Sequence, residues 1–294
     1  MKKNLEITGH RGAIYTQCLI DKNTLFTGSA DGYVASWDLK TGQQNQFSIN
    51  CARPVYSLAF NPDFNHLWIA LNNGDQHVIE LVSKKEIKYF QQHRSAVFSS
   101  LHLDKLSMMV CSDADGNLSI WDSKNLKLLL FLPLLCGKIR KLSCNSDQSL
   151  LLINAQDSTL RVFETTGFNE IITLPGHKEG TCSSLFSPLD ESLIISGGKD
   201  GLLKVWDWEK EKLTKEIPAH HFAIYDLVTD SSNSFLYSSS RDKSIKKWNL
   251  KDLSFVEKVE LKQGGHKHSV NSLSIHKNEL ISSGDDSKIV TWII

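Results

Sequence analysis

An all-β fold made of seven repeats is predicted by a recurring segment, a constant period and short alternating strand patterns. The segment SADGYVASWDL at residues 29–39 recurs as DADGNLSIWDS from 113, GKDGLLKVWDW from 198 and SRDKSIKKWNL from 240. Weaker copies are NNGDQHVIEL from 72, QDSTLRVFET from 156 and DDSKIVTWII from 285. Self-similarity at a fixed period of this length is typical of solenoids and propellers.

The spacing of the repeats is nearly constant. Their closing aromatic or apolar residues, 42 to 44 residues apart, are Trp37, Ile79, Trp121, Phe163, Trp206, Trp248 and Trp292. Short alternating runs such as YVASW and LLKVW are bounded by Gly, Asp, Asn and Ser, and no helical periodicity competes with them. About four short strands fit one such period.

A single four-stranded sheet exposes two apolar faces, so each repeat must be covered by its neighbours. In a closed ring, each of the seven sheets has both apolar faces covered by its neighbours. We therefore predict one seven-bladed β-propeller domain over residues 1–294. The last repeat reaches the end of its third strand at Trp292 to Ile294, while residues 3–8 (KNLEIT) precede the first repeat. We infer that this N-terminal strand completes the last blade and removes two unpaired sheet edges.

Two dipeptides connect these repeats with a known family. Gly-His opens repeats at His10, His177 and His266, with variants at Gln92-His93 and Ala219-His220, and Trp-Asp closes three repeats. The chain therefore resembles the WD40-repeat family along essentially its whole length. The resemblance implies a propeller closed by the N-terminal strand.

The resemblance also implies a buried hydrogen-bonded tetrad of His, Ser or Thr, Asp and Trp in each complete repeat. Four repeats carry full sets: His10, Thr27, Asp31 and Trp37; His177, Ser196, Asp200 and Trp206; His220, Ser238, Asp242 and Trp248; and His266, Ser282, Asp286 and Trp292. Four copies favour a structural role over a catalytic triad, since an enzyme needs one exposed nucleophile. No catalytic residue is predicted.

Three repeats depart from this pattern. The third keeps His93, Asp115 and Trp121 but has Cys111 at the hydroxyl position. The matching positions in the other two are Cys51, Ile69, Asn73 and Ile79 in the second repeat, and Leu135, Ile153, Asp157 and Phe163 in the fourth. These two blades are expected to depend on apolar packing.

Composition argues against several other functions. The 33 Lys and Arg balance 33 Asp and Glu, which lowers the expectation of nucleic-acid binding, and no apolar stretch is long enough to span a membrane. The six cysteines lack zinc spacing, and the pair His266 and His268 has no further ligand at a recognisable spacing. No phosphate-binding glycine loop is present. Neither a metal nor a cofactor is therefore predicted. We expect a cytoplasmic protein.

In the WD40 family, partners most often bind on the rim of the central channel. The family's contact positions lie five residues after the Gly-His histidine, three residues after it and one residue before the turn aspartate. Here these positions supply Tyr15, Tyr56, Phe98, Lys138, Arg140, Lys199, Tyr225 and Arg241. Aromatic side chains and Arg dominate interface hot spots, and the four cations would suit an acidic or phosphorylated peptide.

The leading hypothesis is a non-catalytic scaffold or adaptor that binds a protein or peptide on this rim. The alternative is a propeller hydrolase or lyase with its active site in the channel, and a third possibility is nucleic-acid binding through the basic sector. The repeats name neither the partner nor the oligomeric state.

Overall fold

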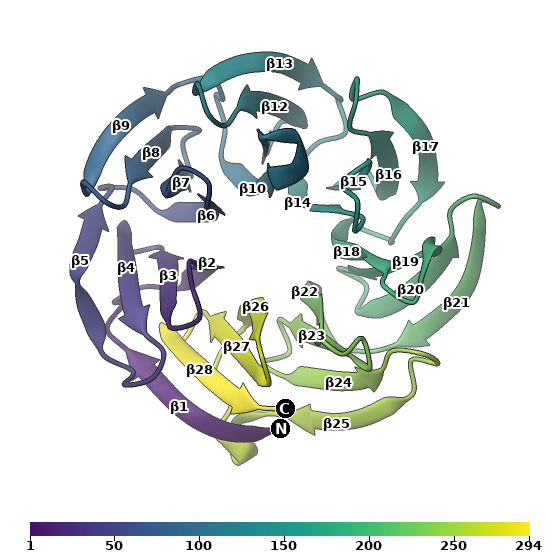
Figure 1. Cartoon of the computed structure of the whole chain (residues 1–294). Coiled ribbons are helices and arrows are strands. Elements are labelled where there is room, and N and C mark those ends of the chain that lie inside the picture. The colour runs from purple at the N-terminus through teal and green to yellow at the C-terminus, as the bar shows by residue number, and fades with distance from the viewer. The chain divides into compact units, whose positions relative to one another are not determined.

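All 294 residues are described by the computed structural model, which is built from β-strands and two 3₁₀ turns, Asp104–Leu106 and Leu261–Gln263 (Figure 1). The strands form seven four-stranded antiparallel sheets, and the chain is a seven-bladed β-propeller. The predicted fold class is confirmed. No helix is long and apolar enough to cross a membrane.

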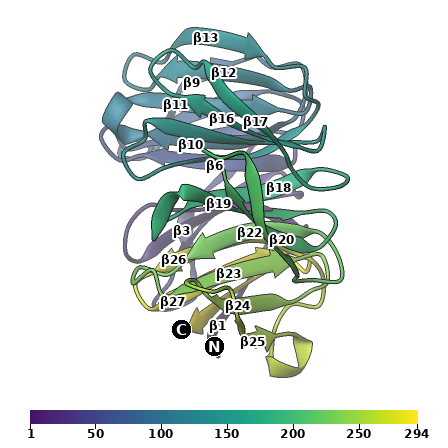
Figure 2. The same ribbon diagram turned by 90° about the vertical axis from the view of Figure 1, so that its right-hand side faces the viewer.

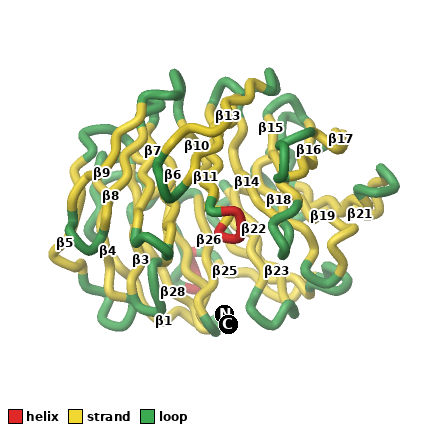
Figure 3. The backbone as a smooth tube through the Cα atoms, turned by 45° about the horizontal axis from the view of Figure 1, so that its top comes forward, coloured by secondary structure: helices red, strands yellow, loops and turns green.

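The chain divides into two compact units, which we call the N-terminal unit (residues 10–142) and the C-terminal unit (residues 1–9 and 143–294). Strands dominate both units (Figure 3). Whether residues 1–294 act as one domain stays a prediction.

The N-terminal unit holds the first three blades. Blade 1 comprises β2 (Ile14–Leu19), β3 (Thr24–Ser29), β4 (Tyr33–Asp38) and β5 (Gln44–Asn50). Blade 2 comprises β6 (Val55–Asn61), β7 (His66–Leu71), β8 (Gln76–Glu80) and β9 (Lys85–Phe90). Blade 3 comprises β10 (Val97–Leu103), β11 (Met108–Asp113), β12 (Asn117–Asp122) and β13 (Lys127–Pro133).

The other blades lie mainly in the C-terminal unit. Blade 4 comprises β14 (Ile139–Cys144), β15 (Leu150–Ala155), β16 (Thr159–Glu164) and β17 (Glu170–Pro175). Blade 5 comprises β18 (Thr181–Ser187), β19 (Asp190–Gly198), β20 (Leu202–Asp207) and β21 (Lys212–Pro218). Blade 6 comprises β22 (Ile224–Thr229), β23 (Phe235–Ser240), β24 (Ile245–Asn249) and β25 (Phe255–Val259). Blade 7 comprises β26 (Val270–His276), β27 (Glu279–Gly284), β28 (Lys288–Ile293) and β1 (Lys2–Thr8).

The core lies between neighbouring blades of each unit. In the N-terminal unit, Phe26 and Val34 of blade 1 pack against Leu67 and Ile69 of blade 2. In the C-terminal unit, Leu203 of blade 5 belongs to one cluster with several residues of blade 6. The second strand of most blades is therefore nearly all buried, as in β7, whereas the outer strand β9 is mostly exposed.

A β-bulge recurs between the first and second strands of the blades. The pairing register skips one residue there, and the skipped residues are Tyr15, Tyr56, Phe98, Cys182, Tyr225 and Asn271. A bulge bends its strand and changes the direction of a side chain. Four predicted contact residues thus occupy the one position per blade where the ladder is interrupted.

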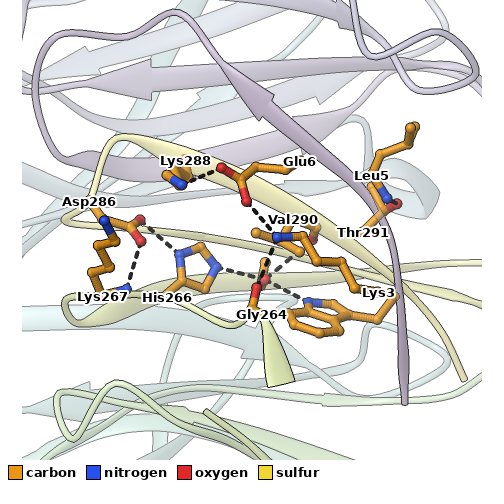
Figure 4. Close-up of polar contacts among 12 residues, drawn as sticks. Lys3, Leu5, Glu6, Gly264, His266, Lys267, Asp286, Lys288, Val290 and Thr291 are labelled. Carbon is orange, nitrogen blue, oxygen red and sulfur yellow. Dashed lines mark hydrogen bonds and ion pairs between the residues drawn. The ribbon is translucent and has the colours of Figure 1, made fainter. Parts of the chain in front are cut away.

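The N-terminal strand closes blade 7, which confirms the predicted closure. Strand β1 pairs with β28 in antiparallel register, with Ile7 opposite Ile289. The backbone N–H of Leu5 donates to Thr291 Oγ1 at 3.2 Å, and Glu6 bridges Lys3 and Lys288 (Figure 4). The two chain ends consequently lie beside one another (Figures 1 and 2).

Candidate functional site

The tetrad residues of blade 1 form one continuous hydrogen-bonded chain. His10 Nδ1 lies 2.9 Å from Asp31 Oδ2, and His10 Nε2 lies 2.8 Å from Thr27 Oγ1. Trp37 Nε1 donates to the same hydroxyl at 2.7 Å. Because an indole only donates and a carboxylate only accepts, the hydroxyl donates to Nε2 and the Nδ1 proton points to Asp31.

Blades 5, 6 and 7 repeat this arrangement in the C-terminal unit. The His–Asp distances are 2.9, 2.9 and 2.8 Å for His177, His220 and His266. Each histidine also lies 2.8 Å from its serine, Ser196, Ser238 or Ser282. Trp206, Trp248 and Trp292 each donate to that serine at 2.9 Å.

These networks are buried and internally satisfied. Thr27 and the three serines are all 0% exposed, so none of these hydroxyls can meet a substrate. In blade 7, His266 and the Lys267 N–H both contact the Asp286 carboxylate (Figure 4). The other ring nitrogen of His266 contacts Ser282. A satisfied buried network rigidifies its surroundings.

The tetrad aspartates remain ionised. Burial alone would raise the pKa of Asp242, but hydrogen bonds and charge from His220, together with Ser244, outweigh it and lower that pKa. Burial lowers the pKa of His220, although the hydrogen bond and the charge of Asp242 act to raise it. In blade 6 the favoured state is therefore a neutral His220 imidazole that donates to the Asp242 carboxylate.

Blade 3 corrects one expectation. His93 contacts Asp113 Oδ2 at 2.7 Å, not Asp115, and its Nε2 lies 2.7 Å from Ser119 Oγ. Trp121 Nε1 donates to Ser119 at 2.8 Å, so the blade has a complete network. Ser119 lies directly opposite Cys111 in the β11–β12 ladder, and the hydroxyl has therefore moved to the neighbouring strand.

Blades 2 and 4 lack the histidine, and the backbone corrects its predicted position in blade 2. Cys51 N–H donates to Gly32 O and Leu134 N–H to Gly116 O, as Gly176 N–H donates to Ser158 O just before His177. Ala52, not Cys51, therefore stands at the histidine position, as Leu135 does in blade 4. Both adopt left-handed backbones, with φ of 56° and 53°.

Blade 4 was expected to depend on apolar packing, but Leu135 at its histidine position does not take part in it. Its side chain is 89% exposed, while the next residue, Cys136, is 1% exposed. The positive φ turns the chain so that the cysteine is buried and the leucine is not. Ile153 and Phe163 of the same blade are buried as expected, although the neighbouring Asn154 is buried as well.

Five of the predicted contact residues come together in the N-terminal unit. The rings of Tyr15 and Tyr56 meet edge to face at 5.0 Å, and those of Tyr56 and Phe98 lie 5.0 Å apart at 32°. We call these three side chains the aromatic row. Lys138 Nζ lies 4.5 Å from the Phe98 ring centre and Arg140 Cζ lies 6.0 Å from it.

The other three predicted contact residues, Lys199, Tyr225 and Arg241, belong to the C-terminal unit. The expected sector of four cations is thus divided between the two units. Arg241 lies over the Phe222 ring at 6.0 Å, and Phe222 is 56% exposed. Lys199 is exposed in the turn before Asp200.

A pocket of about 510 Å³ also lies in the C-terminal unit. Its lining comprises Phe222, Arg241, Lys243, His268, Ser269 and Asp285. Counting only three fixed positions per repeat missed Phe222, Lys243 and His268. Phe222 and His268 lie two residues after a tetrad histidine, and Lys243 lies one residue after a tetrad aspartate. Including these two positions of each repeat would have found them.

Metal ligation has little geometric support. No group of three or more His, Cys, Asp or Glu side chains is placed to hold a metal ion. His266 is engaged by Ser282 and Asp286, while His268 lies in the pocket lining.

Comparison with known proteins agrees with the geometry. Residues 1–38, 168–207 and 211–249 match the family model of the WD domain, G-beta repeat. The chain thus carries WD40 repeats in these three stretches and folds into seven four-stranded blades.

Several curated proteins are similar to this chain. Pre-mRNA-processing factor 17 of Homo sapiens is 28% identical over 72% of the chain and 38% of that protein. Nuclear distribution protein nudF of Aspergillus niger is 20% identical over 77% of the chain and 56% of that protein. DDB1- and CUL4-associated factor 13 of Xenopus tropicalis is 25% identical over 42% and 28%, so the chain spans well under two thirds of each relative.

Proposed function

We propose that this chain is a non-catalytic scaffold or adaptor that binds a protein or peptide segment on the channel rim. The observation that carries the proposal is the aromatic row with Lys138 and Arg140 beside it. Rigid aromatic rings offer large contact area at low entropic cost, which suits them to interface hot spots. One relative is named for association with other proteins, which agrees with a binding role.

The partner segment is acidic or phosphorylated. Lys138 and Arg140 place two positive charges at one end of the aromatic row. Arg can bind a carboxylate or phosphate through two parallel hydrogen bonds, which adds direction as well as charge. Lys199, Tyr225 and Arg241 supply further contacts from the C-terminal unit, where the Arg241 pocket offers a second place for an anion.

A hydrolase or lyase has less support. The Ser, His and Asp groups that could serve such chemistry are engaged with one another, and the hydroxyls are buried. Nucleic-acid binding also has less support, because the chain has no net positive charge: 33 Lys and Arg balance 33 Asp and Glu. We place the chain's action in the cytoplasm.

The test replaces the aromatic row while the tetrads stay intact. The variant Tyr15→Ala/Tyr56→Ala/Phe98→Ala and the wild type serve as baits, and captured proteins are compared by quantitative mass spectrometry. We expect at least about a tenfold loss of the specific partners, the effect of removing one or more hot spots.

A matched control is Tyr33→Ala, which removes a tyrosine that is 43% exposed on β4 of blade 1. The control should capture the wild-type partners. Thermal melting must show both variants folded. Unchanged capture by a folded triple variant would contradict the proposed site, and turnover of a substrate by the wild type would contradict a non-catalytic role.

A further inference from the structure

Leu135 is an exposed apolar side chain beside the proposed site. At 89% exposure it exceeds every other exposed large apolar residue, the next being Val82 at 74%. It lies in the connection between β13 and β14, the segment that also carries Lys138. Single exposed leucines are common on protein surfaces, so exposure alone decides nothing.

The backbone adds a second observation. Leu135 has a φ of 53°, a left-handed conformation that glycine adopts freely and a leucine adopts at a cost. Leu253, with a φ of 53°, is 5% exposed within the blade 5–blade 6 cluster, and Leu126, with a φ of 54°, packs against the blade 2–blade 3 cluster. For those two leucines, burial of the side chain offsets the cost of the left-handed backbone conformation. Leu135 has no such burial.

The segment around Leu135 is held at both ends. Leu134 N–H donates to Gly116 O at 2.8 Å, and Cys136 is buried at 1% exposure. Three residues after Leu135, the Lys138 ammonium lies over Phe98. The leucine is therefore displayed from a fixed backbone, which lowers the entropic cost of using it in a contact.

We infer that Leu135 is an apolar anchor for the partner, and that the partner segment carries a large apolar residue close to an acidic one. The inference rests on the proposed function and names the chemistry of its partner. The apolar residue packs on Leu135, and the acidic residue meets Lys138 or Arg140. Complementary charge therefore selects the segment, and apolar burial adds affinity.

The chain sets the spacing of the two features. Leu135 and Lys138 are three residues apart, so their Cα atoms are separated by at most about 11 Å, and Leu135 and Arg140 by at most about 18 Å. An extended partner segment covers those distances in about three to five residues. Because these separations are upper limits, we expect the acidic residue within about five positions of the apolar one.

The experiment selects peptides from a display library of random 12-residue sequences on the wild-type full chain. Selected peptides should be enriched in a Leu, Ile, Met or Phe residue with Asp or Glu within about five positions. Affinity for the labelled peptides is then measured for Leu135→Gly, Leu135→Met, Ala52→Gly and the triple variant of the aromatic row. Melting temperatures are measured in parallel.

The expected results separate binding from folding. Leu135→Gly should weaken binding at least about tenfold while its melting temperature stays equal or rises, since glycine favours a positive φ. Leu135→Met should stay within about threefold of the wild type. Ala52→Gly makes the same backbone change at the equivalent position of blade 2, where φ is 56°, and should leave binding unchanged.

Three outcomes would overturn the inference. Peptides that lose affinity for the triple variant but bind Leu135→Gly as tightly as the wild type would remove the anchor and leave the proposed function standing. Peptides that bind both variants normally would overturn the anchor and the proposed site together. Failure of the wild type to enrich any such peptide would also reject both.

Discussion

Blades 6 and 2 are both four-stranded sheets, but their interiors are stabilised by different means. In blade 6, His220 links Asp242 and Ser238 at 2.9 and 2.8 Å, and Trp248 completes the chain. In blade 2, every residue of β7 is buried, and Trp68 stacks on Phe90 with ring centres 5.5 Å apart. Blade 6 buries a satisfied polar network, whereas blade 2 has the buried apolar residues Ile69 and Ile79 at the positions of the network's hydroxyl and tryptophan.

The difference indicates that the histidine and its hydroxyl partner are retained or lost together, while the turn carboxylate can remain, as Asp157 does in blade 4. A half-satisfied polar network leaves buried donors or acceptors without partners, which costs more than an apolar interior. Blade 3 supports this view, because the serine that its second strand lacks is supplied by Ser119 on the third strand. Blades 2 and 4 have instead lost the histidine together with its hydroxyl partner.

The largest expected effect comes from removing the central apolar side chain of blade 2. Trp68 is 1% exposed and contacts Phe90 and Trp121, so Trp68→Ala should lower the free energy of unfolding by about 3–5 kcal/mol. Urea unfolding followed by fluorescence measures the change. Val82→Ala, at an exposed turn of the same blade, should change it by less than about 0.5 kcal/mol. Equal losses from the two variants would refute apolar packing as the basis of blade 2.

A smaller effect is expected from the hydroxyl of blade 3. Ser119→Ala leaves His93 Nε2 and Trp121 Nε1 without their partner and should cost about 2–4 kcal/mol, since each unsatisfied buried group costs about 1–3 kcal/mol. Cys111→Ser puts a hydroxyl at the position expected from the repeat pattern and should change stability by less than about 1 kcal/mol. The reverse ranking of these two variants would show that Cys111 holds the hydroxyl position after all.

The smallest expected effect concerns the charge state of blade 6. The pKa of Asp242 is lowered below its ordinary value of 3.8, so its ionised form stabilises the fold above that pH and the contribution is lost as pH falls through the folded-state value. Burial lowers the pKa of His220 below 6.5, so the unfolded chain binds this proton first and stability also falls on acidification.

Asp242→Asn tests this picture. The variant should lose about 1.5 kcal/mol at pH 7, the contribution of a hydrogen bond to a charged group. That difference should shrink below about pH 4, where the carboxyl of Asp242 becomes protonated in the unfolded wild-type chain. Urea unfolding at a series of pH values measures it. A difference that grows between pH 7 and 5 would indicate a charged His–Asp pair.

Sequence reasoning reached much of the candidate site because its contact positions recur with the blade period. Tyr15, Tyr56 and Phe98 could be found by counting, and the recurrent bulge explains why one position per blade is special. Their mutual contact could not be counted, since it depends on how adjacent blades pack. The exposure of Leu135 was missed because an apolar residue at a core position gives no sign of its φ angle.

The sequence by itself determined the period, the seven blades and the closure of the last blade by residues 3–8, because alternating strands with open edges can bury their faces in few ways. Only the tertiary structure decided which side chain completes each network. Ser119 and Cys111 stand opposite one another across two strands, so either could have carried the hydroxyl. The cross-strand register determines which residue carries the hydroxyl, and the backbone conformation determines that Leu135 is exposed. Neither can be read from the sequence.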